Sequence, residues 1–155
     1  YSHPLNGLWL AGGASNSGAG VLKKFFSDDK LEMLSSQINI NSNSGLKYYP
    51  LREKGERFPF NDPNFRPSIS PRPKDDVLFL QGLMEGIAQI EALCYQEIRS
   101  RGGPAITQLF TCGGGAKNKI WSLIRSKKLN LKITTPTNNE PAIGSALIPL
   151  LKLKA

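Results

Sequence analysis

Residues 105–128 read AITQLFTC GGG AKN KIWSLIRSKK, and this stretch decides the fold. Ala105–Cys112 has the composition of a short β-strand, three glycines follow it, and Lys119–Lys128 has the apolar spacing of a short helix. A turn without Cβ atoms lets the backbone approach a flat ring or a phosphate closely. The helix that follows presents unpaired N–H groups and its positive dipole end to an anion.

The same alternation continues toward the C-terminus. Leu131–Thr135 is another strand candidate, and a last helix is expected to start at Pro141 and to kink or fray near Pro149. Strand, glycine turn, helix, strand and helix in this order predict an α/β fold in which helices cover a layered sheet.

Toward the N-terminus, the clearest expected helix is Asp75–Arg101, where apolar residues recur at steps of three and four and Gly102-Gly103-Pro104 ends the pattern. Before it, Tyr48–Pro73 contains six prolines, which predict an ordered loop. Residues 39–46 read as a polar turn, and residues 7–26 as a Gly/Ser-rich turn that opens a helix.

The bulk composition indicates a single globular domain over residues 1–155. Cys94 and Cys112 have no CxxC partner, so we expect reduced thiols in small apolar niches and no metal site. No run approaches 18 apolar residues, and we expect no membrane partner. The net charge of +8 raises the possibility of nucleic-acid binding, but the basic residues are scattered and not interleaved with aromatics, so we expect no nucleic-acid partner.

Local chemistry leaves the role of the glycine turn open. Its spacing matches neither a P-loop nor GxGxxG, so it is either a tight strand-to-helix connection or a ligand contact. Ala116 is small enough to pass under a ring, and the Asn118 amide can both donate and accept, which suits an adenine edge.

Five segments in order nevertheless resemble the FGGY carbohydrate kinases, which include the glycerol, xylulose and ribulose kinases. The turn followed by Trp121 resembles the family's GGGA-x-N motif, and the resemblance covers about residues 5–151. The four further segments are Gly12–Gly18, Gly55–Pro59 with Asp62-Pro63, Gly82–Ala88 and Glu140–Ala146. Within the family the sequence looks closest to xylulokinase-like enzymes that act on ketopentoses such as D-ribulose or D-xylulose.

The resemblance implies the C-terminal lobe of an actin-like, ribonuclease-H-like fold that binds ATP against an N-terminal lobe. Carried onto this sequence, Gly114, Gly115 and Ala116 would pack under adenine and ribose, Asn118 would lie near the base, and Gly18 on the phosphate side. For each glycine the alternative to nucleotide binding is that it serves only the geometry of its turn. Glu85 would be structural, Gly144 would let the last helix pack closely, and Glu56 would brace a loop by pairing with Arg57 or would serve only fold packing.

The same resemblance limits what this chain can do. The family's general base is an aspartate in a G-x-x-D context upstream, and none of the aspartates here has that context, so we expect no catalytic residue in this chain. Residues 65–74 also lack the family's glycine-rich run. A start at Tyr1 suggests a fragment or processed product; Mg²⁺ and the sugar would be held mainly by the missing part, and the fragment alone would be inactive.

Three hypotheses follow from these observations. The first is the ATP-binding lobe of a sugar kinase located in the cytoplasm, or in the plastid stroma of a photosynthetic eukaryote. The second is a non-catalytic nucleotide-binding or interaction module derived from the same fold. The third is a basic nucleic-acid-binding domain. The isolated lobe is also expected to expose an apolar face.

Overall fold

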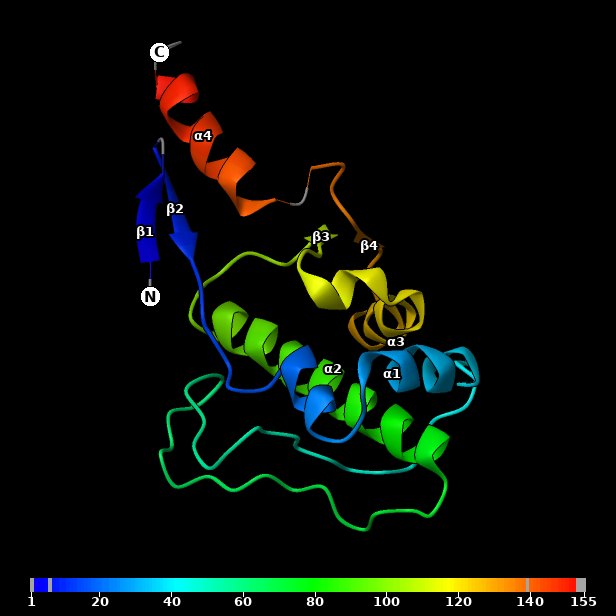
Figure 1. Cartoon of the computed structure of the whole chain (residues 1–155). Helices are drawn as coiled ribbons and strands as arrows, with labels where there is room; N and C mark the ends of the chain where they lie inside the picture. The colour runs from blue at the N-terminus through cyan, green and yellow to red at the C-terminus, as the bar shows by residue number, and fades with distance from the viewer. Residues whose placement is uncertain (1, 6, 139, 153–155) are drawn as a thin grey trace.

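Helix α2 is the central element of the fold (Figure 1). The computed structural model describes residues 2–5, 7–138 and 140–152. α2 spans Asp76–Ser100, close to the predicted range. Asp75 caps its start by accepting a hydrogen bond from the Val77 N–H at 2.8 Å, and Gly102, at φ 90°, follows its end.

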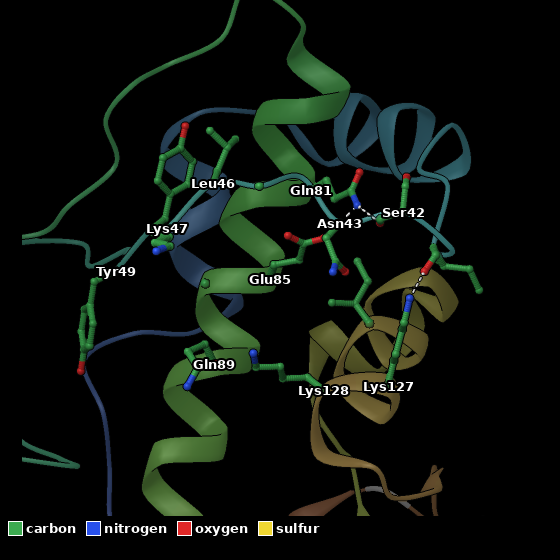
Figure 2. Close-up of a pocket in the computed structure, with 15 residues that line it drawn as sticks. Ser42, Asn43, Leu46, Lys47, Tyr49, Gln81, Glu85, Gln89, Lys127 and Lys128 are labelled. Atoms are coloured by element: carbon green, nitrogen blue, oxygen red, sulfur yellow. Dashed lines mark hydrogen bonds between the residues drawn. The ribbon is translucent and has the colours of Figure 1, made fainter.

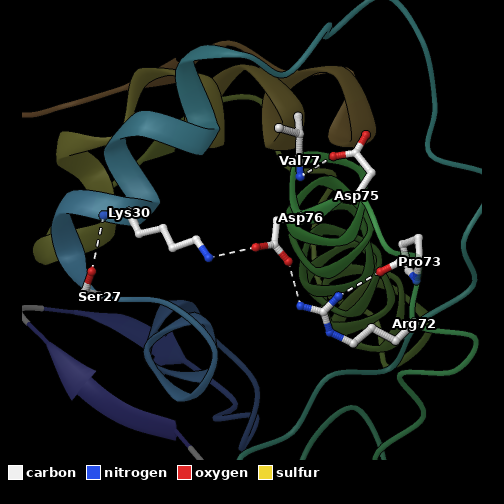
Figure 3. Close-up of polar contacts among 7 residues, drawn as sticks. All are labelled: Ser27, Lys30, Arg72, Pro73, Asp75, Asp76 and Val77. Carbon is white, nitrogen blue, oxygen red and sulfur yellow. Dashed lines mark hydrogen bonds and ion pairs between the residues drawn. The ribbon is translucent and has the colours of Figure 1, made fainter.

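Ion pairs anchor the first turn of α2 to two other segments. Asp76 bonds Lys30 Nζ of α1 and Arg72 of the preceding loop, each at 2.7 Å (Figure 3). The hydrogen bond from Lys30, followed by that from Arg72, lowers the pKa of the Asp76 carboxyl. The exposed start of α2 is thereby tied to α1 and to the loop.

The core surrounds the N-terminal half of α2, where the six consecutive residues Phe79–Met84 are buried. Helices α1 (Asp28–Ser36) and α3 (Lys119–Leu129) and the 3-10 helix η1 (Ala19–Lys24) pack against α2. Phe79 is fully buried, and its ring has edge contacts to three other aromatic rings. The buried apolar side chains of α2 are those of Phe79, Leu80, Leu83, Met84, Ile87, Ala88 and Ile90.

The burial of α2 explains why a long apolar helix occurs in a chain for which no membrane partner is expected. In the described residues α2 is long and apolar enough to do so by length and composition, with a mean hydropathy of 1.4 over 18 residues. However, 56% of that window is buried inside the protein. The apolar character of α2 is accounted for by its place in the core.

The strands are short and form two separate sheets in the part of the chain that the structure describes. β1 (Ser2–Leu5) pairs with β2 (Leu8–Ala11) in an antiparallel hairpin. β3 (Leu109–Phe110) pairs in parallel with β4 (Ile133–Thr134). The predicted strands at 105–112 and 131–135 therefore exist, but only their centres pair.

Two other expectations need correction. Residues 8–11 form a strand and not part of a turn, because they pair antiparallel with residues 2–5. The last helix, α4 (Pro141–Lys152), contains Pro149 as expected, but a Cβ at Gly144 would meet no atom within 4 Å. Gly144 therefore does not serve close packing in the described residues.

The proline-rich segment 48–73 is a loop, as predicted, and it folds back on itself. Tyr49 pairs with Ser68 and Glu56 with Asp62 in two isolated antiparallel bridges. Figure 1 shows this loop below α2, on the side away from α3. Both cysteines are free; Cys94 is half-buried, whereas Cys112 is exposed and does not fill an apolar niche.

Candidate functional site

The glycine turn forms a short 3-10 helix, η2 (Gly114–Lys117), directly before α3. Gly113 precedes it with φ 81° and ψ −175°, a conformation that residues with a side chain rarely adopt. The Ala116 N–H donates to the Gly113 carbonyl at 3.1 Å, and the Asn118 N–H to the Gly115 carbonyl at 3.2 Å. Glycine is therefore required at 113 for the backbone, whatever the turn binds.

A second glycine starts the 3-10 helix η1 in the same manner. Gly18 has φ 155° and ψ −177°, and its carbonyl accepts the Val21 N–H at 2.9 Å. The first N–H groups of a 3-10 helix have no partner within the helix, so both short helices begin with such groups. Gly18 and Gly113 thus play equivalent local roles almost a hundred residues apart.

The tertiary structure brings these two segments together. A Cβ built on Gly115 would lie 3.3 Å from Ala19 Cβ and 3.9 Å from Trp121 Nε1. By contrast, Cβ atoms on Gly18, Gly20, Gly113 or Gly114 would meet no atom within 4 Å. Gly115 therefore packs against η1. Beside Gly18, Gly20, Gly113 and Gly114 there is open space, where a planar group could approach the backbone.

The Asn118 side chain is partly used by the fold. Its Oδ1 accepts the Trp121 N–H at 3.0 Å, which caps α3, and its Nδ2 donates to Ser35 Oγ of α1 at 2.8 Å. Ser35 is buried. The amide keeps one N–H and one lone pair beyond these bonds, so its capacity for a base edge is smaller than the residue type suggests.

The glycine-rich loop before η1 is fastened to the segment 49–57. The Glu56 carboxylate, only 1% exposed, accepts the Ser15 hydroxyl and the Asn16 N–H, each at 2.7 Å. It also accepts the Tyr49 hydroxyl at 2.8 Å and the Arg57 N–H at 2.9 Å. Burial alone would raise the Glu56 pKa, but these four hydrogen bonds together lower it.

Of the two roles considered for Glu56, the pairing with the Arg57 side chain is not seen. Among the described residues these two side chains form no salt bridge; instead Arg57 Nε donates to Asn16 Oδ1 at 2.7 Å. Both side chains therefore reach the same glycine-rich loop separately. Sequence reasoning missed Ser15 and Asn16 as their partners, and the only available signal was their place inside a segment that resembles the family.

Glu85 plays the structural role that was expected of it. Its carboxylate accepts the N–H and the hydroxyl of Ser44, and Gln81 Nε2 donates to it at 2.8 Å. It lines a half-open pocket of about 820 Å³ between the segment 40–49, α2 and the end of α3 (Figure 2). None of the five residues predicted to bind nucleotide lines this pocket.

Two further features bear on the expected ligands. The described residues contain no group of three or more His, Cys, Asp or Glu side chains that could hold a metal ion. The strand β2 exposes large apolar side chains, with Leu8 at 74% and Trp9 at 72% of full exposure. Such a patch is typical of a surface that another part of a protein covers.

The comparisons with known proteins agree with the resemblance seen in the motifs. A profile of the C-terminal domain of the FGGY family of carbohydrate kinases matches residues 2–151. The xylulose kinase of Staphylococcus xylosus is 34% identical over 119 residues, which are 73% of this chain and 23% of that protein. The crystal structure of xylulose kinase from Bifidobacterium adolescentis matches with a TM-score of 0.66 and 25% identity, over 81% of this chain and 26% of that one. The chain spans about a quarter of the length of these relatives.

Proposed function

The chain belongs to the FGGY family of carbohydrate kinases as its C-terminal domain, and we propose that it is the ATP-binding lobe of an enzyme that transfers the γ-phosphoryl group of ATP to a sugar hydroxyl. The sugar is a ketopentose, D-xylulose or D-ribulose. Its fold is that of the C-terminal lobe of an actin-like, ribonuclease-H-like ATPase. The enzyme acts in the cytoplasm, or in the plastid stroma of a photosynthetic eukaryote.

One observation carries this proposal: Gly115 packs against Ala19 while the neighbouring glycines face open space. Adenine and ribose lie over Gly114, Gly115 and Ala116, Asn118 offers its remaining amide hydrogen to the base, and Gly18 lies on the phosphate side. The cradle fits a nucleotide because a flat ring can approach a backbone that carries no Cβ atoms. The N–H groups at the start of each 3-10 helix favour a negative ligand.

The remaining parts of the reaction belong to the rest of the enzyme. Phosphoryl transfer requires nucleotide, Mg²⁺, acceptor hydroxyl and base to be placed together. The base aspartate and the main ligands of Mg²⁺ lie in an N-terminal lobe, which covers the apolar side chains that β2 exposes. The 155 residues alone bind nucleotide and do not transfer phosphate.

The test uses the full-length protein that carries these residues. It is supplied with Mg-ATP and, in separate reactions, D-xylulose, D-ribulose, glycerol and L-fucose, and release of ADP is followed by a coupled assay. We expect turnover with at least one ketopentose well above the rate without sugar. No turnover with any of the sugars, from protein that is folded, would contradict the proposal.

The second candidate is a nucleotide-binding module of the same fold that keeps the glycine turn but lacks catalysis. Binding of ADP by the full-length protein without turnover of any sugar would support it. Turnover would exclude it.

A further inference from the structure

Glu56 is an unusual residue for a loop, because its charged carboxylate is 1% exposed. A buried charge is costly unless it is hydrogen-bonded. Here each oxygen accepts two donors: Oε1 the N–H groups of Asn16 and Arg57, and Oε2 the hydroxyls of Ser15 and Tyr49. The carboxylate is satisfied on both oxygens, and its partners come from three separate segments of the chain.

Two of the four donors lie in the loop that leads to Gly18. Ser15 and Asn16 bond Glu56 directly, and Asn16 Nδ2 also donates to the Gly55 carbonyl at 3.0 Å. The next residue continues the attachment, since Ser17 Oγ donates to the Pro50 carbonyl at 2.7 Å and the Ser17 N–H to Ser15 Oγ at 3.0 Å. Every residue from 15 to 17 is therefore fixed to the segment 50–56 immediately before Gly18.

This attachment matters because the loop is rich in glycine. Glycines at 12, 13, 18 and 20 give it more backbone freedom than an ordinary loop, and ordering such a segment costs conformational entropy. A loop held only by its ends would place Ala19 loosely against Gly115. A preorganised site needs neighbouring groups that hold its backbone in place.

We propose that Glu56 is a positioning residue of the nucleotide site, which holds the backbone of Ser15–Ser17 so that Gly18 starts η1 and Ala19 meets Gly115 of the glycine turn. The inference rests on the proposed function, because it assigns Glu56 to the nucleotide site of that function. Glu56 does not touch the nucleotide; it acts through the loop.

The chain offers a matched control in Glu85. Its carboxylate also accepts hydrogen bonds from the N–H and the hydroxyl of a serine in a loop, Ser44. It accepts a third hydrogen bond from the Gln81 side chain. It differs in place, because it holds the segment 42–46 beside the pocket of Figure 2 and not the glycine-rich loop. Loss of either carboxylate should destabilise the fold, but only loss of Glu56 should loosen the site.

The experiment compares Glu56→Gln and Glu85→Gln in the full-length protein that carries this chain, with Mg-ADP binding measured by calorimetry and folding by circular dichroism. In glutamine an NH₂ group replaces one of the two carboxylate oxygens. That NH₂ group would face two hydrogen-bond donors and could accept from neither. We expect the dissociation constant of Mg-ADP to rise about tenfold in Glu56→Gln and to stay within about twofold in Glu85→Gln, while both variants melt at a lower temperature. Equal affinity of folded Glu56→Gln and wild type overturns the inference, and so does an equal loss in both variants.

A second pair of variants covers the case in which Glu56→Gln does not fold. Ser15→Ala removes a donor in the loop, whereas Tyr49→Phe removes a donor outside it, and both retain the carboxylate. We expect weaker Mg-ADP binding, by about threefold, only in Ser15→Ala. Wild-type affinity in Ser15→Ala overturns the inference. If wild-type protein itself does not bind Mg-ADP, the proposed function fails; if it binds and the loop variants bind equally well, only the role of Glu56 fails.

Discussion

Asn118 and Ser35 join two helices that lie far apart in the chain: Asn118 Nδ2 donates to Ser35 Oγ at 2.8 Å. The other end of the same amide caps α3 through the Trp121 N–H. A residue that the sequence proposes for the adenine edge therefore also holds α1 against the start of α3.

We predict that Asn118→Ala destabilises the protein by about 1–2 kcal/mol, because it removes the N-cap of α3 and leaves the buried Ser35 hydroxyl without this donor. Asn118→Asp keeps the side-chain oxygen that caps α3 and should lose less stability. Urea unfolding measures the stability of both variants. Equal destabilisation by the two substitutions would contradict the role assigned to the cap.

A second prediction concerns Arg125, which forms a bidentate pair with Glu91 at 2.7 Å and donates to Thr111 Oγ1 at 2.8 Å. The side chains of the pair are 11% and 20% exposed. Arg125→Met should cost about 2–3 kcal/mol, since it leaves the Glu91 carboxylate largely buried and unpaired.

The double variant Arg125→Met with Glu91→Leu should recover part of that loss, because no unpaired charge remains. The exposed pair Lys23–Asp28 is the control, and Lys23→Ala should change stability by less than about 0.5 kcal/mol. A double variant less stable than Arg125→Met alone would refute this account.

A third prediction separates two helical glycines. A Cβ on Gly86 would lie 2.7 Å from the Tyr48 carbonyl oxygen and 3.0 Å from Pro50 Cδ, whereas one on Gly144 would meet nothing within 4 Å. Gly86→Ala should therefore destabilise by about 1–3 kcal/mol despite the better helix propensity of alanine. Gly144→Ala should be neutral or stabilising by up to about 1 kcal/mol. Thermal melts of the two variants test this, and a stabilised Gly86→Ala would disprove the close approach.

The fourth prediction concerns the ligand contact of the turn. A Cβ on Gly114 meets no protein atom within 4 Å, so Gly114→Ala should leave the melting temperature nearly unchanged. Because the added methyl group enters the space assigned to the nucleotide, the dissociation constant of Mg-ADP should rise about tenfold. Lys117→Ala, at an exposed position of the same turn, is the control and should bind normally. Unchanged affinity in Gly114→Ala would place the nucleotide elsewhere.

The fifth prediction is a pH dependence of stability that comes from Glu56. Burial raises its pKa, but the four hydrogen bonds outweigh burial, so the folded-state pKa is below the ordinary carboxyl value. A lowered folded-state pKa means that the carboxylate contributes stability above the ordinary pKa and loses that contribution as pH falls through the folded value.

The difference in melting temperature between wild type and Glu56→Gln should accordingly be largest near pH 7 and shrink below about pH 4. The pKa of the Asp76 carboxyl is also lowered, by Lys30 and then Arg72, so its contribution to stability is also lost as pH falls. Because Asp76 is present in both proteins, that contribution cancels in the difference. A difference that is constant from pH 7 to pH 3 would show that the pKa of Glu56 is the same in the folded and the unfolded protein, which would contradict the lowered folded-state pKa.

Local sequence determines much of this protein. Helix α2 is predictable because its apolar spacing, its acidic cap and its glycine stop all agree, and the proline-rich loop is predictable because proline cannot donate to a sheet. The glycine turn is visible as a turn, and its order among four other motifs identifies the family that the profile match then confirms.

The tertiary structure alone decided which distant residues meet. No local pattern shows that Gly115 packs on Ala19, that Asn118 bonds Ser35, or that Glu56 holds Ser15 and not Arg57, because these contacts join segments 40 to about 100 residues apart. The hairpin of β1 and β2 is local and was missed for a different reason, since a strand is defined by its partner as much as by its own residues. Backbone propensity acts over a few neighbours and is readable in sequence; the packing and hydrogen bonds that build the site depend on how the whole chain folds back on α2.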